Sequence, residues 1–226
     1  MKLARTGAII VVLLFVALVA LLALRTQLPG PSPEIESLKP VEVRDYEGTP
    51  LSSIADFREN SIRGPQRVDR ANYTLTVDGL VRANKTYTYD EVLGSHARYR
   101  KMVTLYCVEG WDVTILWDGV LVRDLIDEAG ADPGATSVIF YAADGYSTSL
   151  PLGYVRDRDI LMAYAMNNVT LPAERGFPFQ LVAEDRWGYK WIKWITRIEL
   201  TNLSYYGYWE SRGYSNSGDL NRSFLA

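Results

Sequence analysis

The chain has 226 residues, enough for one sizeable domain or two small ones, and its apolar fraction of 48% and charged fraction of 23% are those of an ordinary globular protein. Its formal net charge of −3 gives no electrostatic reason to expect nucleic acid as a partner, because such binding usually needs a basic face. The single cysteine, Cys107, and the single histidine, His96, exclude a closed zinc site built from nitrogen and sulfur ligands, and also iron–sulfur clusters held by several cysteines.

An uncharged apolar run opens the chain over residues 6–24, after Lys2 and Arg5. At about 1.5 Å of rise per residue, this run is just long enough to cross the hydrocarbon layer, and the basic residues place the N-terminus in the cytoplasm. A cleaved signal peptide is the alternative, but the run continues to Arg25 without a polar cleavage site of small residues. We therefore expect a transmembrane anchor over residues 1–25, with the rest of the chain on the extracellular or periplasmic side.

Residues 26–49 are predicted to form an extended linker. Their first part, TQLPGPSPEIESLKP, contains Pro29, Pro31, Pro33 and Pro40. Proline disfavours both helix and sheet, and proline-rich spacers tend to be extended. One folded domain with a C-terminal tail is then expected over residues 50–226.

The short strands and the few short helices expected in that domain predict an α+β fold with mixed β-sheets and short helices. Strand patterns cover residues 73–81, 98–108, 177–185 and 195–202, and a further pair of strands surrounds the Asp144–Gly145 turn within residues 136–150. Helix patterns cover residues 88–95 and 120–130, the second ending at Gly130 as a C-cap. Residues 159–168 fit either a strand or a helix.

The ordinary role of a lone cysteine such as Cys107 is to pack as a small hydrophobic side chain. A cysteine nucleophile would need a base, and the one histidine, His96, lies 11 positions away in another predicted element. Composition alone therefore favours a packed thiol over a Cys107–His96 pair.

The residues around Cys107 indicate another role. The segment YCVEGWDVTILWDGVLVRDLI resembles the cysteine motif of the sulfite-oxidase-like molybdopterin oxidoreductases. Four more segments resemble further parts of that family in the family's order: DFRENSIRGP, FYAADGYSTSLPL, LPAERGFPFQLVAEDRWGYKWIKWITRIEL and GYWESRGYSNSGD. In size and in its C-V-E motif the chain looks most like the periplasmic methionine-sulfoxide reductase catalytic subunits of the family.

The resemblance implies a sulfite-oxidase-type fold and a molybdenum–molybdopterin cofactor, with tungsten as a possible substitute. A soft thiolate can complete the sulfur ligands of a metal that a pterin dithiolene holds, so Cys107 is the implied metal ligand and a catalytic residue. The other implied catalytic residues are Glu109, Asp144 and Tyr146. The implied cofactor-binding residues are Arg58, Glu59, Asn60, Arg175, Gln180, Lys190, Trp191, Ile192 and Lys193.

One departure from the family pattern concerns the phosphate of the cofactor. The family often has a basic residue where Gln180 stands, and glutamine donates hydrogen bonds but carries no charge. The family's H-G or N-G is Arg175–Gly176 in this chain. We expect Arg175 and Lys193 to supply the positive charge that Gln180 lacks.

The function implied by the resemblance is oxygen-atom or electron transfer on a small sulfur- or nitrogen-oxide substrate. Electrons would pass to or from a separate partner, such as a membrane haem protein, a cytochrome or a quinone-linked carrier. Two alternatives remain open at this point. One is a non-catalytic domain of the same fold that binds a ligand or a partner, since a fold does not guarantee an activity. The other is a thiol enzyme that uses His96.

Overall fold

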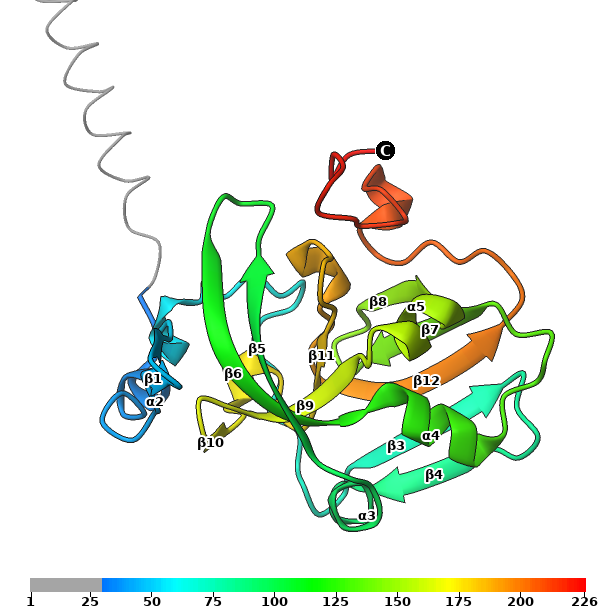
Figure 1. Cartoon of the computed structure of the whole chain (residues 1–226), viewed down its shortest axis with the longest axis horizontal. Helices are drawn as coiled ribbons and strands as arrows, with labels where there is room; N and C mark the ends of the chain where they lie inside the picture. Colours follow the sequence, from blue (N-terminus) through cyan, green and yellow to red (C-terminus); the bar gives the residue numbers. More distant parts are fainter. Residues whose placement is uncertain (1–29) are drawn as a thin grey trace, which may run out of the picture.

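The computed structural model describes residues 30–226, and two five-stranded sheets form most of this part of the chain (Figure 1). The strands of the first sheet are β10 (Val169–Thr170), β9 (Leu161–Met166), β6 (Asp112–Leu121) and β5 (Tyr99–Tyr106) in spatial order, and β11 (Gln180–Val182) also pairs with β9. The strands of the second sheet are β4 (Lys85–Thr88), β3 (Thr74–Gly79), β12 (Ile195–Thr201), β7 (Ser137–Ala142) and β8 (Ser147–Pro151). The first sheet is antiparallel, whereas β3 and β12 make the second sheet mixed because they pair in parallel.

The helices are short. They are α2 (Pro33–Glu36), α3 (Tyr89–Ser95), α4 (Val122–Ala129) and α5 (Leu152–Asp157). Single 3-10 turns are η1 (Ile54–Asp56), η2 (Ala173–Arg175), η3 (Gly188–Lys190) and η4 (Glu210–Arg212), and a small hairpin consists of β1 (Asp45–Tyr46) and β2 (Thr49–Pro50). The predicted α+β class with short helices is therefore confirmed.

Local sequence signals account for several of these elements. Thr88 and Glu91 form a reciprocal capping box at the start of α3. Gly130 ends α4 with a left-handed φ of 72°, which a glycine adopts without steric penalty. The ambiguous residues 159–168 contain the strand β9, and the strand expected over 177–185 is shortened to β11.

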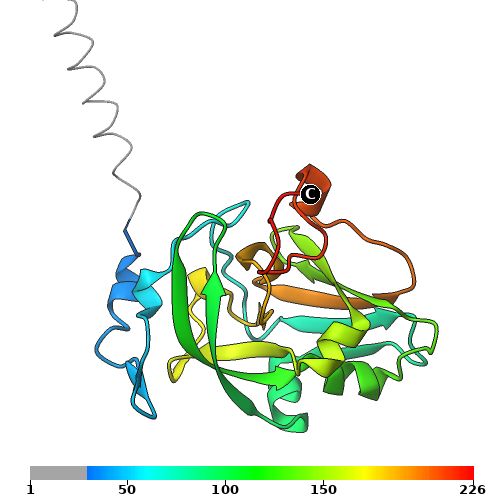
Figure 2. The same cartoon turned by 45° about the horizontal axis from the view of Figure 1, so that its top comes forward.

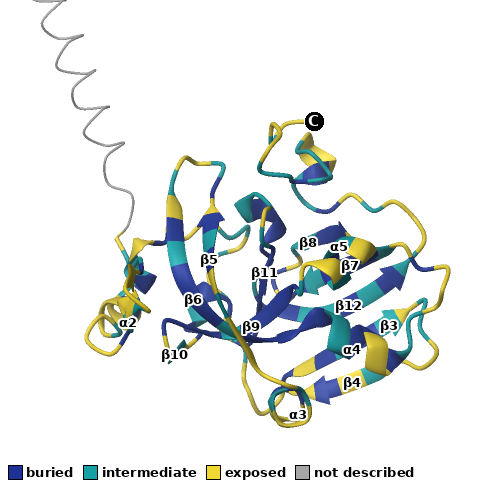
Figure 3. Cartoon of the chain, viewed as in Figure 1, coloured by how far each residue is buried: buried dark blue, intermediate teal, exposed yellow. Residues whose placement is uncertain are grey.

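A single hydrophobic core joins the two sheets. Its fully buried side chains include Leu75 of β3, Trp117 of β6, Phe140 of β7 and Leu161 of β9. Figure 3 shows the inner parts of both sheets as buried, with exposed residues concentrated in the helices and loops. The core fixes the ends of the strands, and these ends carry the candidate site.

The N-terminal part of the described chain packs on the domain from Pro33 onward. For this part the prediction of an extended linker over residues 26–49 is wrong, and residues 26–29 lie outside the described residues. Ile35 of α2 is buried, and the buried carboxylate of Glu42 accepts hydrogen bonds from the Ser53 hydroxyl at 2.5 Å and from the Ile54 amide at 2.8 Å. Burial of these groups ties the segment from Pro33 onward to the folded domain, and Pro33 and Pro40 therefore lie within a docked segment.

The predicted anchor over residues 1–25 lies outside the described residues. Within residues 30–226, no helix has the length and apolar character needed to cross a bilayer.

The C-terminal segment after β12 folds back over β8 and the turn that contains η3 (Figure 2). The Tyr208 amide donates to the Ser147 carbonyl at 2.9 Å, and the Trp187 amide donates to the Gly218 carbonyl at 2.8 Å. The tail is therefore part of the folded domain, and it lies beside the segment that faces Cys107.

Candidate active site

A β-hairpin positions the thiol of Cys107. The residue directly follows β5, and its amide donates to the Trp111 carbonyl at 2.9 Å just before β6 begins. Gly110 closes the turn with a φ of 81°, in the left-handed region that glycine tolerates best. Cys107 is 6% exposed, so a rigid hairpin holds a nearly buried thiol at the end of a core strand.

Two cavities meet at this thiol. We call the larger one, of about 160 Å³, the aromatic cavity because six rings line it: Tyr146, Tyr189, Trp191, Trp194, Trp209 and Tyr214. We call the smaller one, of about 50 Å³, the basic cavity because Arg58, Arg175 and Lys193 line it together with one carboxylate, that of Glu174. Both cavities share Asn60, Cys107, Gly188, Trp191 and Lys193 in their walls.

A third cavity, of about 480 Å³, extends the basic cavity toward residues 30–32, and we call it the outer cavity. It shares Phe57, Arg58, Glu174 and Arg175 with the basic cavity. Together the basic and outer cavities are large enough to accept a group much larger than a water molecule beside Cys107.

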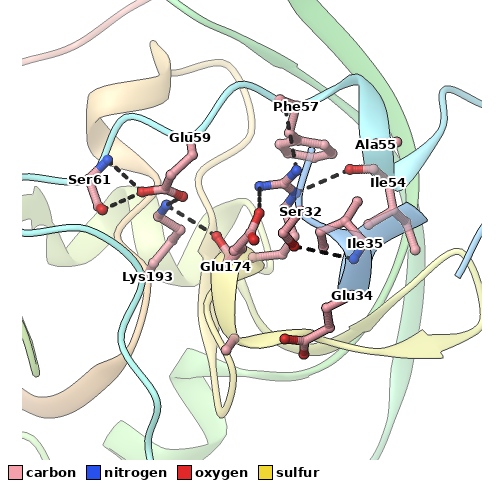
Figure 4. A network of polar contacts seen from close by, with 12 residues as sticks. Ser32, Glu34, Ile35, Ile54, Ala55, Phe57, Glu59, Ser61, Glu174 and Lys193 are labelled. Atoms are coloured by element: carbon pink, nitrogen blue, oxygen red, sulfur yellow. Dashed lines mark hydrogen bonds and ion pairs between the residues drawn. The ribbon is translucent and has the colours of Figure 1, made fainter. Parts of the chain in front are cut away.

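The loop that follows η1 brings three of the predicted cofactor-binding residues, Arg58, Glu59 and Asn60, to these cavities. Figure 4 shows one of them, Glu59, with its partners Ser61 and Lys193. The Asn60 Nδ2 atom lies 3.7 Å from the Cys107 Sγ atom. The Glu59 carboxylate accepts from the Lys193 ammonium at 2.9 Å and from the Ser61 amide at 2.8 Å. Burial acts to raise the pKa of Glu59, but Lys193 and the Ser61 hydrogen bonds outweigh it, so this pKa lies below its usual range.

Arg175 lines the basic and outer cavities, but its guanidinium is directed mainly at the protein. Nε donates to the Ile54 carbonyl at 3.1 Å, Nη2 donates to the Phe57 carbonyl at 3.4 Å, and Nη1 lies 3.5 Å from the Glu174 carboxylate. The side chain therefore fastens the loop that carries Arg58 to Asn60. This use of its donors weakens the expectation that Arg175 replaces the charge absent at Gln180.

The remaining residues of the cofactor block divide into two groups. Gln180 lines the basic cavity, Ile192 lines the aromatic cavity, and Trp191 and Lys193 line both, as expected for residues that contact a cofactor.

Lys190 is different, and its predicted role needs a correction. Its fully buried ammonium lies 2.5 Å from the Glu210 carboxylate and donates to the Ser149 carbonyl at 3.0 Å, and it lines none of the three cavities. A buried ammonium requires an opposite charge beside it. Lys190 of η3 therefore pairs with Glu210 of η4, and the pair joins the two turns.

The predicted catalytic residues all line the aromatic cavity with Cys107. The Glu109 carboxylate accepts from the Trp111 indole at 3.0 Å. Asp144 is 2% exposed and accepts from the Tyr146 amide at 2.9 Å, which stabilises the β7–β8 turn. The Tyr146 hydroxyl donates to the Tyr189 carbonyl at 2.5 Å, and burial raises its pKa well above the usual value.

The environment of Cys107 keeps its thiol protonated when no metal is bound. Burial raises the pKa of Cys107 to about 11, and the hydrogen bond from the Glu109 amide and the charge of Arg58 oppose this shift only in part. Coordination to a metal removes a thiol proton outright. A bound metal would therefore convert this thiol into the thiolate ligand.

The alternative pair of Cys107 and His96 is not formed. His96 precedes β5 and Cys107 follows it, and a strand of that length spans about 26 Å at about 3.3 Å per residue. The two ring nitrogens of His96 face the Val92 carbonyl at 3.0 Å and the Glu128 carboxylate at 3.1 Å.

Sequence reasoning missed most of the aromatic wall. Trp209 and Tyr214 come from the C-terminal tail, which the sequence presented only as a segment resembling the family's tail. Tyr189 and Trp194 flank predicted residues without having been singled out. The dense aromatic content of the tail was the available signal, but no spacing rule places a tail against a hairpin more than 100 positions earlier.

Comparison with known proteins agrees with this geometry. The family described as "Oxidoreductase molybdopterin binding domain" matches residues 62–209. The chain belongs to this family of molybdopterin-binding oxidoreductases. It is therefore an oxidoreductase domain, and its cofactor is molybdenum–molybdopterin.

Individual relatives support the assignment. The uncharacterized oxidoreductase YuiH of Bacillus subtilis is 33% identical over 69% of this chain and 78% of its own length. The putative protein-methionine-sulfoxide reductase subunit YedZ1 of Azospira oryzae is 32% identical over 79% of this chain and 66% of its own length. The sulfane dehydrogenase SoxCD of Paracoccus pantotrophus shares the fold, with a TM-score of 0.61 and 23% identity over 68% of this chain and 43% of its own.

The residues around Cys107 fit this cofactor. A soft thiolate can face the metal from the hairpin, and the metal's other sulfur ligands come from the pterin dithiolene. Arg58 and Lys193 line the basic cavity with cationic donors that suit the cofactor's phosphate. The donors of Arg175, in contrast, face mainly the Ile54 and Phe57 carbonyls. The amide of Gln180 adds hydrogen-bonding groups to the same wall.

Proposed function

We propose that this protein is a membrane-anchored molybdenum–pterin oxidoreductase that transfers an oxygen atom, with the accompanying electrons, to or from a small sulfur- or nitrogen-oxide substrate. The observation that carries the proposal is the position of Cys107, at the junction of a basic cavity suited to the cofactor and an aromatic cavity suited to a substrate. The cofactor would then occupy the cavity on one side of the thiol, and the substrate would occupy the cavity on the other side.

When bound, the cofactor supplies two-electron redox and oxygen-atom transfer chemistry. Cys107 holds the metal, and Asn60 Nδ2, 3.7 Å from Sγ, orients the sulfur and tunes its electron density. Lys193 and Arg58 bind the phosphate side, helped by Gln180. Trp111 donates to the Glu109 Oε2 atom at 3.0 Å, and Glu109 is the carboxylate proposed for proton transfer in the aromatic cavity.

The membrane anchor and the electron partner belong to the same proposal. The uncharged run over residues 6–24 would hold the domain on the extracellular or periplasmic face. A membrane haem protein, a cytochrome or a quinone-linked carrier would then exchange electrons with it. The name of the Azospira relative as a subunit supports an arrangement in which a separate chain carries the electrons.

The decisive experiment is metal and pterin analysis of the full chain from a host that makes the cofactor. We expect about one molybdenum and one pterin per chain, together with turnover of sulfur or nitrogen oxides by artificial electron donors and acceptors. Protein from that host that contains neither molybdenum nor tungsten would contradict the proposal and favour a non-catalytic binding domain.

The topology has a separate test. Protease added outside intact cells, or to spheroplasts of a bacterium with an outer membrane, should degrade the domain while a cytoplasmic control protein survives. A protected domain, or a domain found free in the medium after processing at the end of the apolar run, would contradict the anchor.

A further inference from the structure

The asparagines of this chain occur in an unusual sequence context. Five of the eight begin the pattern Asn-X-Ser/Thr with X other than proline, which we call a sequon: Asn72, Asn84, Asn168, Asn202 and Asn221. Serine and threonine make up 28 of the 226 residues, so chance would give eight asparagines only about one sequon. Asn-X-Ser/Thr is the acceptor sequence for N-linked sugars, and the excess therefore indicates a modified surface.

All five sequons lie on the surface of the folded domain. Each sequon asparagine is exposed and stands in a turn, a bend or a loop, and each serine or threonine two positions later is also exposed. Within residues 30–226, the walls of the three cavities contain none of these asparagines. Sugars attached to them would extend into solvent and leave the cavities open.

The three asparagines without a sequon have different surroundings. Asn60 lies beside the thiol of Cys107, with Nδ2 3.7 Å from Sγ. Asn167 is buried, and its Nδ2 donates to the Ser52 carbonyl at 2.8 Å. Asn216 is half-buried in the C-terminal tail. The asparagines that serve the site or the packing thus lack the pattern, and those that face solvent in turns have it.

Asn84 has an accessible sequon at both ends. It lies in the connection between β3 and β4, and Thr86 is exposed on β4, an outer strand of the second sheet (Figure 1). At Asn72, by contrast, the nitrogen that would carry a sugar donates to the Asp69 carboxylate at 2.5 Å. Asn84 is therefore the site at which the pattern and the exposure can be tested most directly.

We propose that Asn84 is a site of N-linked glycosylation and that the other four sequon asparagines are further acceptors. This inference rests on the extracellular or periplasmic position of the domain in the proposed function, because N-linked sugars belong to exported chains. It adds a modified surface to the domain and leaves the chemistry at Cys107 unchanged.

The sugar donor is an oligosaccharide joined through phosphate to a membrane lipid. The bond between C1 of its first sugar and the phosphate oxygen breaks, and a bond between that carbon and Nδ2 of Asn84 forms. Nδ2 gives up one proton to a base of the transferring enzyme, and the lipid phosphate leaves. No electrons are exchanged, so the step needs neither the cofactor nor its electron carrier.

The test uses the full chain isolated from the membranes of its own cells. Mass spectrometry of its peptides, with fragmentation that locates any added mass, should find a series of sugar residues on Asn84 in most copies. Asn84→Gln should lose that mass and keep the sugars at the other sequons. An unmodified Asn84 in all copies would overturn the inference.

Substitutions at Thr86 test whether the sequon itself directs the modification. Thr86→Ser keeps the pattern and should keep the sugar, whereas Thr86→Val removes the hydroxyl with little change in shape and should lose it. Thr76→Val is the matched control, since Thr76 faces Thr86 across the β3–β4 pair and belongs to no sequon. A sugar that persists in Thr86→Val would contradict attachment through the sequon.

Protease digestion of the same cells separates this inference from the proposed topology. A domain that is digested from outside but carries no sugar on Asn84 would overturn the glycosylation and leave the topology intact. A domain that is protected and unmodified would defeat both. Thr86→Val should retain its metal, pterin and turnover, because Thr86 lies outside the three cavities.

Discussion

The basic and aromatic cavities meet at one sulfur atom but are assembled in different ways. The basic side consists of the loop around Arg58, the strand β11 and Lys193, and its charged groups belong to segments that resemble family motifs. The aromatic side depends on Trp209 and Tyr214, which reach the site from the C-terminal tail. The basic cavity can thus be located from local motifs, whereas the aromatic cavity depends on long-range docking of the tail.

Two lysines three positions apart show the same contrast. Lys193 lines both cavities, and its ion pair with Glu59 lies at their edge. Lys190 is fully buried against Glu210 of η4, the turn that lies between Trp209 and Tyr214 of the tail. The direction in which a side chain leaves the backbone therefore decides whether a basic residue lines a cavity or stabilises the fold.

The largest effect is expected where the two cavities meet. Cys107→Ser should lower turnover by at least about a thousandfold, because a hydroxyl does not replace a soft thiolate as a metal ligand. The free energy of unfolding should change by only about 1–2 kcal/mol, since the volume is nearly unchanged. The measurements are turnover, the metal's spectroscopic signature and chemical unfolding.

The pterin content of the same variant separates the two sides of the site. Some pterin should remain in Cys107→Ser, because the basic cavity is intact. Full activity of Cys107→Ser would contradict metal binding by Cys107 and would indicate that this residue is a packed core thiol.

The second prediction concerns the aromatic side. Lys190→Met should destabilise the protein by about 3–5 kcal/mol, because it leaves the Glu210 carboxylate buried without its partner. Adding Glu210→Gln should recover at least half of that loss, since it removes the unpaired charge while keeping an acceptor for the Thr148 hydroxyl. Chemical unfolding measures both effects.

Lys193→Met on the same segment is the control. Its partner, Glu59, is partly exposed, so the loss of stability should be about 1 kcal/mol. Equal losses for the two lysines would contradict the division between them.

The third prediction concerns the basic side. Arg58→Gln and Lys193→Gln should each weaken pterin retention by about tenfold, because each removes a charge-assisted hydrogen bond to the phosphate. Pterin per chain after extensive dialysis is the measurement. Arg67→Gln, at an arginine whose side chain is 82% exposed and outside the basic cavity, is the matched control and should keep its pterin.

Much of the fold could be predicted because its signals are local. The capping box at Thr88, the left-handed Gly130 and the turn at Asp144–Gly145 mark element ends within a few residues. The docked segment from Pro33 could not be predicted, because its support comes from residues such as Asn167, whose carbonyl accepts from the Val43 amide at 2.9 Å. Prolines alone look the same in a free linker and in a docked one.

The same limit applies to the candidate site: its local motifs can be recognised in the sequence, but the packing around them cannot. The motif around Cys107 and the basic residues near it led to the basic cavity, but Lys190 lies outside the three cavities and the donors of Arg175 face mainly the protein. Their donors are used by the Ser149 and Ile54 carbonyls and by Glu210. Sequence resemblance locates a basic residue in a block, but only packing shows what its donors face.

The smallest effect is expected for the residue that lies on neither side of the site. His96→Asn should leave turnover within about twofold of the original, because His96 and Cys107 lie at opposite ends of a strand that spans about 26 Å. Loss of the contacts to Val92, Glu128 and the Tyr87 ring should reduce stability by about 1 kcal/mol. Turnover of the cofactor-loaded variant and thermal unfolding are the measurements. A tenfold loss of turnover with full metal and pterin content would contradict this prediction and would give His96 a role in the chemistry of Cys107.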